Sequence, residues 1–333
     1  MTRTLPLAAS AAALLVFGFA PLALSPYWLS LLTIIFFYVC VGQAWNLMMG
    51  YTGILSLGNS LFLGLGGYVT AVLASRYGVV PWIGLPLGAL VGAAMGVVIA
   101  WLGFRFSVRG VYFALLTIAF AEFFRLLFDN WDYVGGAGGV FLPSLGPDES
   151  ILLHLRGSGL LFYYAFLVLA AAVTAISALL VNGRHGFFWR AIREDEEAAR
   201  ALGVRARSMK ILVVAISGAM TAVAGGLFGL MNGSLFPDSM LGMGMSIEII
   251  IAPIIGGLGT LVGPIVGAFF VVPVTEIAND VGQHVGIFGL NTFVYGVMVF
   301  LVIVFLPEGI WPRLRRLATR RQRPDETDGG SDA

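Results

Sequence analysis

The sequence predicts an all-α fold: a polytopic membrane helical bundle of about ten spans, including two short or broken ones. Of the 333 residues, 59% are hydrophobic and only 11% are charged, and the mean hydropathy is +0.92. An ordinary soluble domain carries about a quarter charged residues, so the composition indicates an integral membrane protein with no separate soluble domain. The apolar runs are continuous rather than alternating, which favours helices over the strands of a transmembrane barrel.

The first apolar segment, Leu5 to Leu24, follows Arg3 and is predicted to be a retained transmembrane helix, because further apolar segments follow at once. The alternative is a signal peptide that is removed, since Ala23 to Ser25 forms a passable cleavage motif. The next elements are a second span at Tyr27–Trp45, a tight turn at Gly50–Gly53 and a glycine-rich third span at Ile54–Ser75.

The fourth span, Pro81 to Phe104, carries a small residue at every fourth position. This spacing lines one helix face with small side chains, so a neighbouring backbone can approach closely within the membrane. We therefore predict a helix-packing seam here rather than a substrate path, with a weaker seam on the seventh span. The first seam comprises Gly84, Gly88, Gly92, Gly96 and Ala100, and the second comprises Gly218, Ala222 and Gly226.

Three further spans follow, and they are separated by two long polar segments. The first segment, residues 129–159, contains the run GGAGG and is predicted to be an external loop with glycine turns. The second segment, residues 182–210, is the one long charged interruption between spans. The three spans are predicted at Val111–Phe128, Leu160–Val181 and Ile211–Met231.

The distribution of Lys and Arg predicts the orientation, because short cytoplasmic loops retain positive charge. With the amino terminus inside, 16 of the 19 basic residues fall on the cytoplasmic side, whereas Arg76 and Arg156 fall outside and Arg125 lies within a span. The opposite orientation reverses this bias and is rejected. Both termini are therefore predicted to be cytoplasmic, together with residues 182–210.

This orientation requires an even number of spans between residues 182–210 and the carboxyl-terminal tail, yet only three apolar blocks lie there. The middle block must therefore cross twice or re-enter the membrane. Its centre, Gly256 to Pro264, contains helix breakers and supplies a turn. We predict a short eighth span at Ser246–Ile255, a ninth at Ile265–Ala278, a tenth at Val285–Leu306 and a disordered tail at residues 313–333, which leaves residues 1–312 as the transmembrane domain.

The sequence contains no recognisable catalytic or metal-binding motif. Its three histidines are far apart in predicted loops, and no phosphate-binding loop is present, so transport or scaffolding is favoured over catalysis and no metal or cofactor is predicted. Charges within a membrane are costly and mark functional candidates. The candidate translocation path comprises the polar residues Asn46, Ser56, Asn59, Glu122, Arg125 and Glu248.

The charges among these candidates each have two interpretations. Glu122 and Arg125 are three residues apart and can pair on one helix face, either to serve transport or simply to neutralise each other while Arg125 reaches the surface. Glu248, Glu276 and Asp280 are predicted near the outer surface, where they dock an external partner or form a solvated rim. Such peripheral acids argue against an ion-coupled secondary transporter, which needs a buried acid or an unwound helix near the midplane.

Residues 182–210 are predicted to form a short cytoplasmic helix with one apolar stripe. The acidic residues precede most of the basic ones, and Gly203 stands where a helix C-cap is expected. Such a helix either lies on the membrane surface or fits a socket on a cytoplasmic motor subunit. The stripe comprises Phe188, Ile192, Ala199 and Leu202, with Trp189 beside it.

Five motifs, spread in order along nearly the whole chain, carry a resemblance to a known family. They are GYTGILSLGNSLFLGLGGY at 50–68, RGVYFALLTIAFAEFFRLL at 109–127, GFFWRAIREDEEAARALGV at 186–204, GGLGTLVGPIVGA at 256–268 and LPEG at 306–309. Together they resemble the LivM-type permease subunits of branched-chain amino-acid ABC importers. Two departures bear on substrate or partner preference: Asn59 stands in place of a histidine, and Val134 with Gly138 alters an external glycine motif.

The resemblance implies a bacterial inner-membrane subunit that pairs with a second, LivH-like permease to form the translocation path. Two cytoplasmic ATPases power such importers and a periplasmic binding protein delivers the small-molecule substrate, so this chain is expected neither to hydrolyse ATP nor to bind nucleic acid. Branched-chain amino acids are the leading substrates, ahead of urea, short amides and organic acids. An ion-coupled secondary transporter and a non-transporting scaffold are the alternatives.

The resemblance also implies that the short cytoplasmic helix docks on an ATPase and couples ATP hydrolysis to transport. The residues to which the resemblance assigns this coupling role are Arg190, Ile192, Arg193, Glu194, Asp195, Ala199, Leu202 and Gly203.

Overall fold

The computed structural model describes residues 15–142, 155, 157–285, 293–294, 296–297, 300 and 309–320. The long helices are α2 (Pro26–Thr52), α3 (Asn59–Tyr77), α4 (Pro81–Arg105), α5 (Val111–Asp129), α7 (Gly159–Asn182), α10 (Ala206–Asn232), α12 (Met243–Gly256) and α13 (Gly263–Val285). Shorter helices are η1 (Ala20–Leu22), η2 (Asp132–Val134), η3 (Gly136–Gly138), α8 (Arg184–Glu194), α9 (Glu196–Ala201), α11 (Pro237–Leu241) and α15 (Ile310–Arg320). Two strands, β1 (Val140–Phe141) and β2 (Ser234–Leu235), pair antiparallel, with Val140 opposite Leu235.

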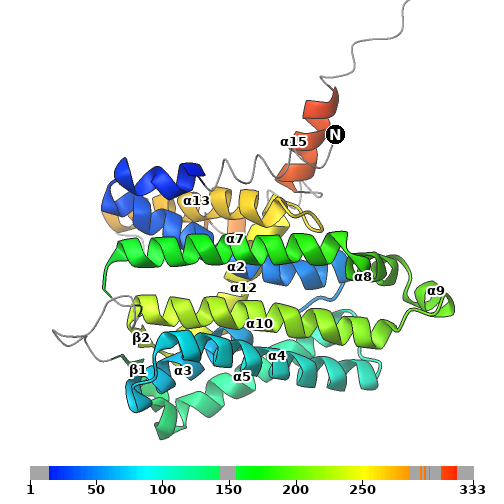
Figure 1. Ribbon diagram of the computed structural model, residues 1–333, viewed down its shortest axis with the longest axis horizontal. Helices are drawn as coiled ribbons and strands as arrows, with labels where there is room; N and C mark the ends of the chain where they lie inside the picture. Colours follow the sequence, from blue (N-terminus) through cyan, green and yellow to red (C-terminus); the bar gives the residue numbers. More distant parts are fainter. Residues whose placement is uncertain are drawn as a thin grey trace, which may run out of the picture.

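Most of the long helices run side by side along the long axis of the molecule (Figure 1). α10 packs against α2, α3 and α4, while α2 also contacts α7, α12 and α13. α8 and α9 lie at one end of this bundle, and β1 and β2 lie at the other (Figure 1). We call these the basic end and the β end, because α8, α9 and the helix ends beside them carry Arg105, Arg109, Arg184, Arg190, Arg193, Arg200, Arg205, Arg207 and Lys210.

Seven segments among the described residues are long and apolar enough to cross a membrane, which confirms the predicted polytopic helical bundle. They are Pro26–Thr52, Pro81–Arg105, Val111–Asp129, Gly159–Asn182, Ala206–Asn232, Pro237–Gly256 and Gly263–Gly282. The predicted tenth span, Val285–Leu306, falls largely outside the described residues, and so does the first half of the predicted first span, Leu5–Leu24. Residues 143–154 and 156 of the predicted external loop, 129–159, also lie outside the described residues.

The boundary between the second and third spans differs from the prediction. α2 continues through Gly50 and ends at Thr52, so the predicted turn is mostly helical. The helix is capped by Gly53, whose φ of 72° is a left-handed conformation that favours glycine. α3 then begins only at Asn59. The residues from Ile54 onward are therefore not the start of a helix, although they are apolar.

Two tertiary hydrogen bonds explain why this connecting segment is not helical. The indole Nε1 of Trp45 donates to the carbonyl oxygen of Ser56 at 2.8 Å. The amide of Leu57 donates to the hydroxyl of Thr117 at 3.1 Å. Because these side chains satisfy buried backbone groups, the segment does not need helical hydrogen bonds. Hydropathy alone cannot distinguish such a segment from a helix.

The small residues of α4 form the predicted packing seam. Gly84 and Gly88 lie against Thr70 and Gly66 of α3, while Gly92 lies against α10. A Cβ atom added to Gly92 would lie 2.6 Å from the Cβ of Ala222 and 2.6 Å from the carbonyl oxygen of Gly218. Only a helix without side chains at these points allows so close an approach.

Replacing Gly92 with Leu is expected to destabilise the bundle by about 3 kcal/mol, because the added side chain must displace the backbone of α10. The thermal unfolding midpoint of the detergent-solubilised protein measures this loss. Gly159→Leu is the matched control, since an added Cβ there meets nothing within 4 Å. Equal stability of the two variants would show that the seam does not hold α4 to α10.

The block from Ser246 to Ala278 forms two helices, α12 and α13, which pack against each other. A short turn joins them, and α2 holds this turn. Asn46 donates from Nδ2 to the carbonyl of Thr260 at 2.9 Å and accepts at Oδ1 from the amide of Gly259 at 2.9 Å. The predicted pair of spans is therefore present, although the first one begins earlier, with α11 at Pro237.

The start of the predicted disordered tail is helical instead. α15 covers Ile310 to Arg320 and contacts α12 and α13. Basic and apolar side chains alternate along it with helical spacing, as in helices that lie at a membrane surface. The contact with α12 and α13 explains why this part of the tail has a fixed structure.

Candidate functional site

The charged segment at the basic end forms two short helices rather than the single predicted one. α8 ends at Glu194, and Asp195 adopts an extended conformation before α9 begins. The carboxylate of Asp195 accepts from the amides of Glu197 at 2.8 Å and Ala198 at 3.0 Å, so it caps the second helix. Gly203, with a φ of 87°, ends α9 as predicted.

One side of the two helices packs against the bundle. Trp189 is fully buried, and its indole donates to the carbonyl of Met209 in α10 at 3.1 Å. Ile192 and Ala199 form a small cluster with Ala206. These contacts confirm most of the predicted apolar stripe.

Leu202 does not belong to this packed side, contrary to the prediction, because 85% of its surface is exposed. The break at Asp195 changes the direction of the chain, so a single helical period does not apply across both helices. On α8, Phe187 is also 68% exposed and lies seven residues before Glu194, which is exposed as well. We call Phe187, Glu194 and Leu202 the outer face of α8–α9.

An ion pair joins α9 to the start of α10. The Glu196 carboxylate pairs with Lys210 and, at 2.5 Å, with Arg200. Partial burial opposes ionisation of Glu196, but the hydrogen bond from Lys210 and the nearby positive charges outweigh it and hold the pKa of Glu196 below its usual range. Arg109, in the α4–α5 loop, lies 4.0 Å from Glu197. α9 is therefore held in place electrostatically as well as by packing.

Two predicted coupling arginines, both exposed, also bind backbone carbonyls. Arg190 donates to the carbonyls of Gly186 at 3.1 Å and Val181 at 3.3 Å, which fixes the junction of α7 and α8. Arg193 donates from Nη1 to the carbonyl of Gly50 at the end of α2. A Cβ atom added to Gly259 would lie 2.9 Å from that nitrogen. Arg193 thus stands between α8, the end of α2 and the α12–α13 turn.

Three of the candidate path residues are buried inside the chain. Asn46 and Asn59 are fully buried and Ser56 is 1% exposed. Asn46 holds the α12–α13 turn, and the Ser56 hydroxyl donates to Asn59 Oδ1 at 2.8 Å. The Asn59 Nδ2 has no hydrogen-bond partner among the described residues. These side chains organise the interior beside the segment that connects α2 to α3.

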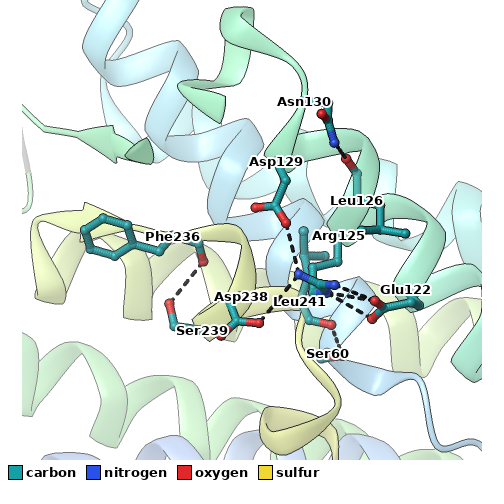
Figure 2. Close-up of polar contacts among 10 residues, drawn as sticks. All are labelled: Ser60, Glu122, Arg125, Leu126, Asp129, Asn130, Phe236, Asp238, Ser239 and Leu241. Carbon is teal, nitrogen blue, oxygen red and sulfur yellow. Dashed lines mark hydrogen bonds and ion pairs between the residues drawn. The ribbon is translucent and has the colours of Figure 1, made fainter. Parts of the chain in front are cut away.

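Glu122 and Arg125 pair as predicted, but the pair extends to two further acids at the β end (Figure 2). Arg125 Nε lies 2.9 Å from Glu122 Oε2, and its Nη1 lies 2.9 Å from Asp129. The same nitrogen lies 3.6 Å from Asp238 of α11. The cluster therefore links α5 to α11 and does more than neutralise charge on one helix.

Glu248 lies near the middle of its apolar segment, whereas the prediction placed it near the outer surface. It is the twelfth of the 20 residues in the segment Pro237–Gly256. The hydroxyl of Tyr38, the thirteenth of the 27 residues of α2, donates to its Oε2 at 2.6 Å. Two helices thus place this carboxylate near the middle of the bundle. Hydropathy missed this because it began the span at Ser246 and left out α11.

The two positions at which the sequence departs from the LivM-type motifs lie in different parts of the structure. Asn59 begins α3 within the bundle, whereas Val134 and Gly138 lie in the turns η2 and η3 at the β end. Val134 is 6% exposed and Gly138 is exposed. Gly138 is therefore the departure that is open to contact with a partner.

The chain matches a family model described as "Branched-chain amino acid transport system / permease component" over residues 27–306. It is 30% identical over 325 residues to the high-affinity branched-chain amino acid transport system permease protein LivM of Escherichia coli K12. The matched region covers 91% of this chain and 74% of the relative. No solved structure matches the chain.

Two other relatives carry different names. The probable branched-chain amino acid transport permease protein LivH of Methanocaldococcus jannaschii is 26% identical over 272 residues, covering 76% of this chain and 82% of the relative. The autoinducer 2 import system permease protein LsrC of Enterobacter sp. strain 638 is 30% identical over 249 residues, covering 72% of this chain and 64% of the relative.

Proposed function

The chain belongs to the branched-chain amino acid transport permease family, and from this premise we propose that it is one of two permease subunits of an ATP-driven ABC importer. It is a multi-pass protein of the inner membrane. The observation that carries the coupling role is the arrangement of α8 and α9, which are anchored to the bundle on one side and present exposed apolar and acidic groups on the other.

The basic end faces the cytoplasm in this proposal. The positive charges of α8, α9 and the neighbouring helix ends gather there, as expected for segments that remain inside. α15, with its own arginines, packs on the α12–α13 pair near the same end. The β end then faces the periplasm, where a substrate-binding protein delivers its ligand.

The outer face of α8–α9 is the docking surface for a cytoplasmic ATPase. Exposed Leu202 and Phe187 supply apolar anchors, and Glu194 supplies charge at the rim. The buried residues Trp189, Ile192 and Ala199 transmit movement of the docked helices to α10. ATP hydrolysis belongs to the two partner ATPases, and this chain supplies the coupling surface and half of the solute path.

Branched-chain amino acids are the proposed substrates, in keeping with the name of the matched family and of the LivM relative. A second candidate function, ion-coupled secondary transport, is favoured by one observation: Glu248 lies near the middle of the bundle, where such transporters keep a titratable acid. The family membership and the exposed face of α8–α9 favour the ATP-driven proposal.

Affinity purification of the tagged chain, expressed with its chromosomal neighbours, tests the proposed assembly. We expect one copy of this chain, one second permease and two ATPase subunits in a single peak by mass photometry. Recovery of the chain by itself, or as a homo-oligomer that excludes co-expressed ATPases, would contradict the proposal.

A further inference from the structure

Glu248 is a carboxylate near the middle of the bundle. Its position in the segment Pro237–Gly256 and that of Tyr38 in α2 agree on this depth. At 1.5 Å per residue, Tyr38 lies about 18 Å from the start of α2 and about 21 Å from its end. Ionisable groups at such depth are costly and mark solute or ion pathways.

The Tyr38 hydroxyl uses only part of the hydrogen-bonding capacity of the Glu248 carboxylate. It donates to Oε2 at 2.6 Å, and among the described residues no cationic side chain forms an ion pair with Glu248. A carboxylate accepts up to about four hydrogen bonds. One oxygen therefore retains its full capacity to accept from a positively charged group.

The helix face that carries Glu248 is open. Met243 is 48% exposed and Ile247 is 42% exposed, and a Cβ atom added to Gly244 meets nothing within 4 Å. Glu248 itself is half-buried beside them. A charged group that faces hydrocarbon costs about 3 kcal/mol, so this face meets a polar path or a partner subunit rather than lipid.

We propose that Glu248 binds the ammonium group of the transported amino acid as it passes along the open face of α12, with Tyr38 positioning the carboxylate. This inference rests on the proposed function and deepens it. An ammonium group offers three donors and a full positive charge, which suits a carboxylate with one oxygen unoccupied. Glu248 then selects amino acids over organic acids and urea, because those solutes lack an ammonium group.

The test measures uptake of radiolabelled L-leucine into proteoliposomes that contain the complete transporter, its binding protein outside and ATP inside. Glu248→Gln is expected to lower the uptake rate at least tenfold, because the amide keeps the shape but loses the charge. Glu248→Asp is expected to restore part of the rate, and Tyr38→Phe to lower it less than Glu248→Gln does. Glu276→Gln, the same change at a half-buried glutamate of α13, is the matched control and is expected to stay within twofold of wild type.

Three results would overturn the inference. Wild-type uptake by Glu248→Gln would do so while leaving the proposed function intact. Loss of the second permease from the purified Glu248→Gln complex would assign the carboxylate to a subunit interface. If the wild type carries only solutes without an ammonium group, both the substrate class and the role of Glu248 fail together.

Discussion

Replacing Leu202 with Asp is expected to weaken the association of the permease with its ATPases about 30-fold. Leu202 is 85% exposed at the end of α9, and an apolar anchor at the centre of an interface contributes about 2 kcal/mol or more. The acid would in addition bury a charge against the partner. Association of the purified ATPase with the reconstituted permease, followed by surface plasmon resonance, measures the change.

The matched control for this substitution is Phe106→Asp. Phe106 is 71% exposed in the α4–α5 loop at the same end of the molecule, but it does not belong to the outer face of α8–α9. We expect its effect on ATPase association to be less than threefold. If both variants bind the ATPase equally well, or lose it equally, the outer face is not the docking surface.

Replacing Arg193 with Ala is expected to uncouple the transporter without detaching the ATPases. Arg193 donates to the carbonyl of Gly50 and lies beside Gly259, so it connects α8 with the turn between α12 and α13. α12 carries Glu248, so a displacement of α8 reaches the proposed solute site through this contact. A hydrogen bond from a charged donor contributes about 1.5–3 kcal/mol, and we expect stimulation of ATP hydrolysis by loaded binding protein to fall at least tenfold.

Arg207→Ala serves as the control, because it removes an exposed positive charge from the same end of the molecule. It is expected to leave the stimulation within twofold of wild type, and Arg193→Lys to give an intermediate value. Full stimulation in Arg193→Ala would show that coupling does not pass through the contact with Gly50. Loss of ATPase binding in that variant would instead assign Arg193 to docking.

The apolar pattern predicted the helices of this bundle well, because continuous apolar runs and glycine spacing are local properties. The seam at Gly92 is an example: the four-residue period predicted a close helix approach, and α10 occupies it. The same reasoning failed between Ile54 and Gly58. There the backbone is satisfied by Trp45 and Thr117, which no local pattern reveals.

The coupling segment shows a second limit of periodicity. The buried positions Trp189 and Ile192 follow from the helical period of α8. The exposure of Leu202 does not, because the side chain of Asp195 caps a new helix and resets the phase. An Asp followed by two glutamates is a recognisable helix-start signal, and it marks the break.

The depth of Glu248 was misjudged for a related reason. Hydropathy assigned Pro237 to Leu241 to the outside, whereas α11 begins the crossing and packs against α3 and α5. The partner of Glu248, Tyr38, is 210 residues away in the sequence. A contact of that range appears only when the helices are placed together.

Uptake of L-leucine by proteoliposomes without an ion gradient tests the central claim most directly. The account predicts that uptake requires ATP, both ATPases and loaded binding protein, and that Leu202→Asp in this chain lowers it at least tenfold while the permease pair stays assembled. Uptake by this chain without ATPases, driven by a sodium or proton gradient, would contradict the account.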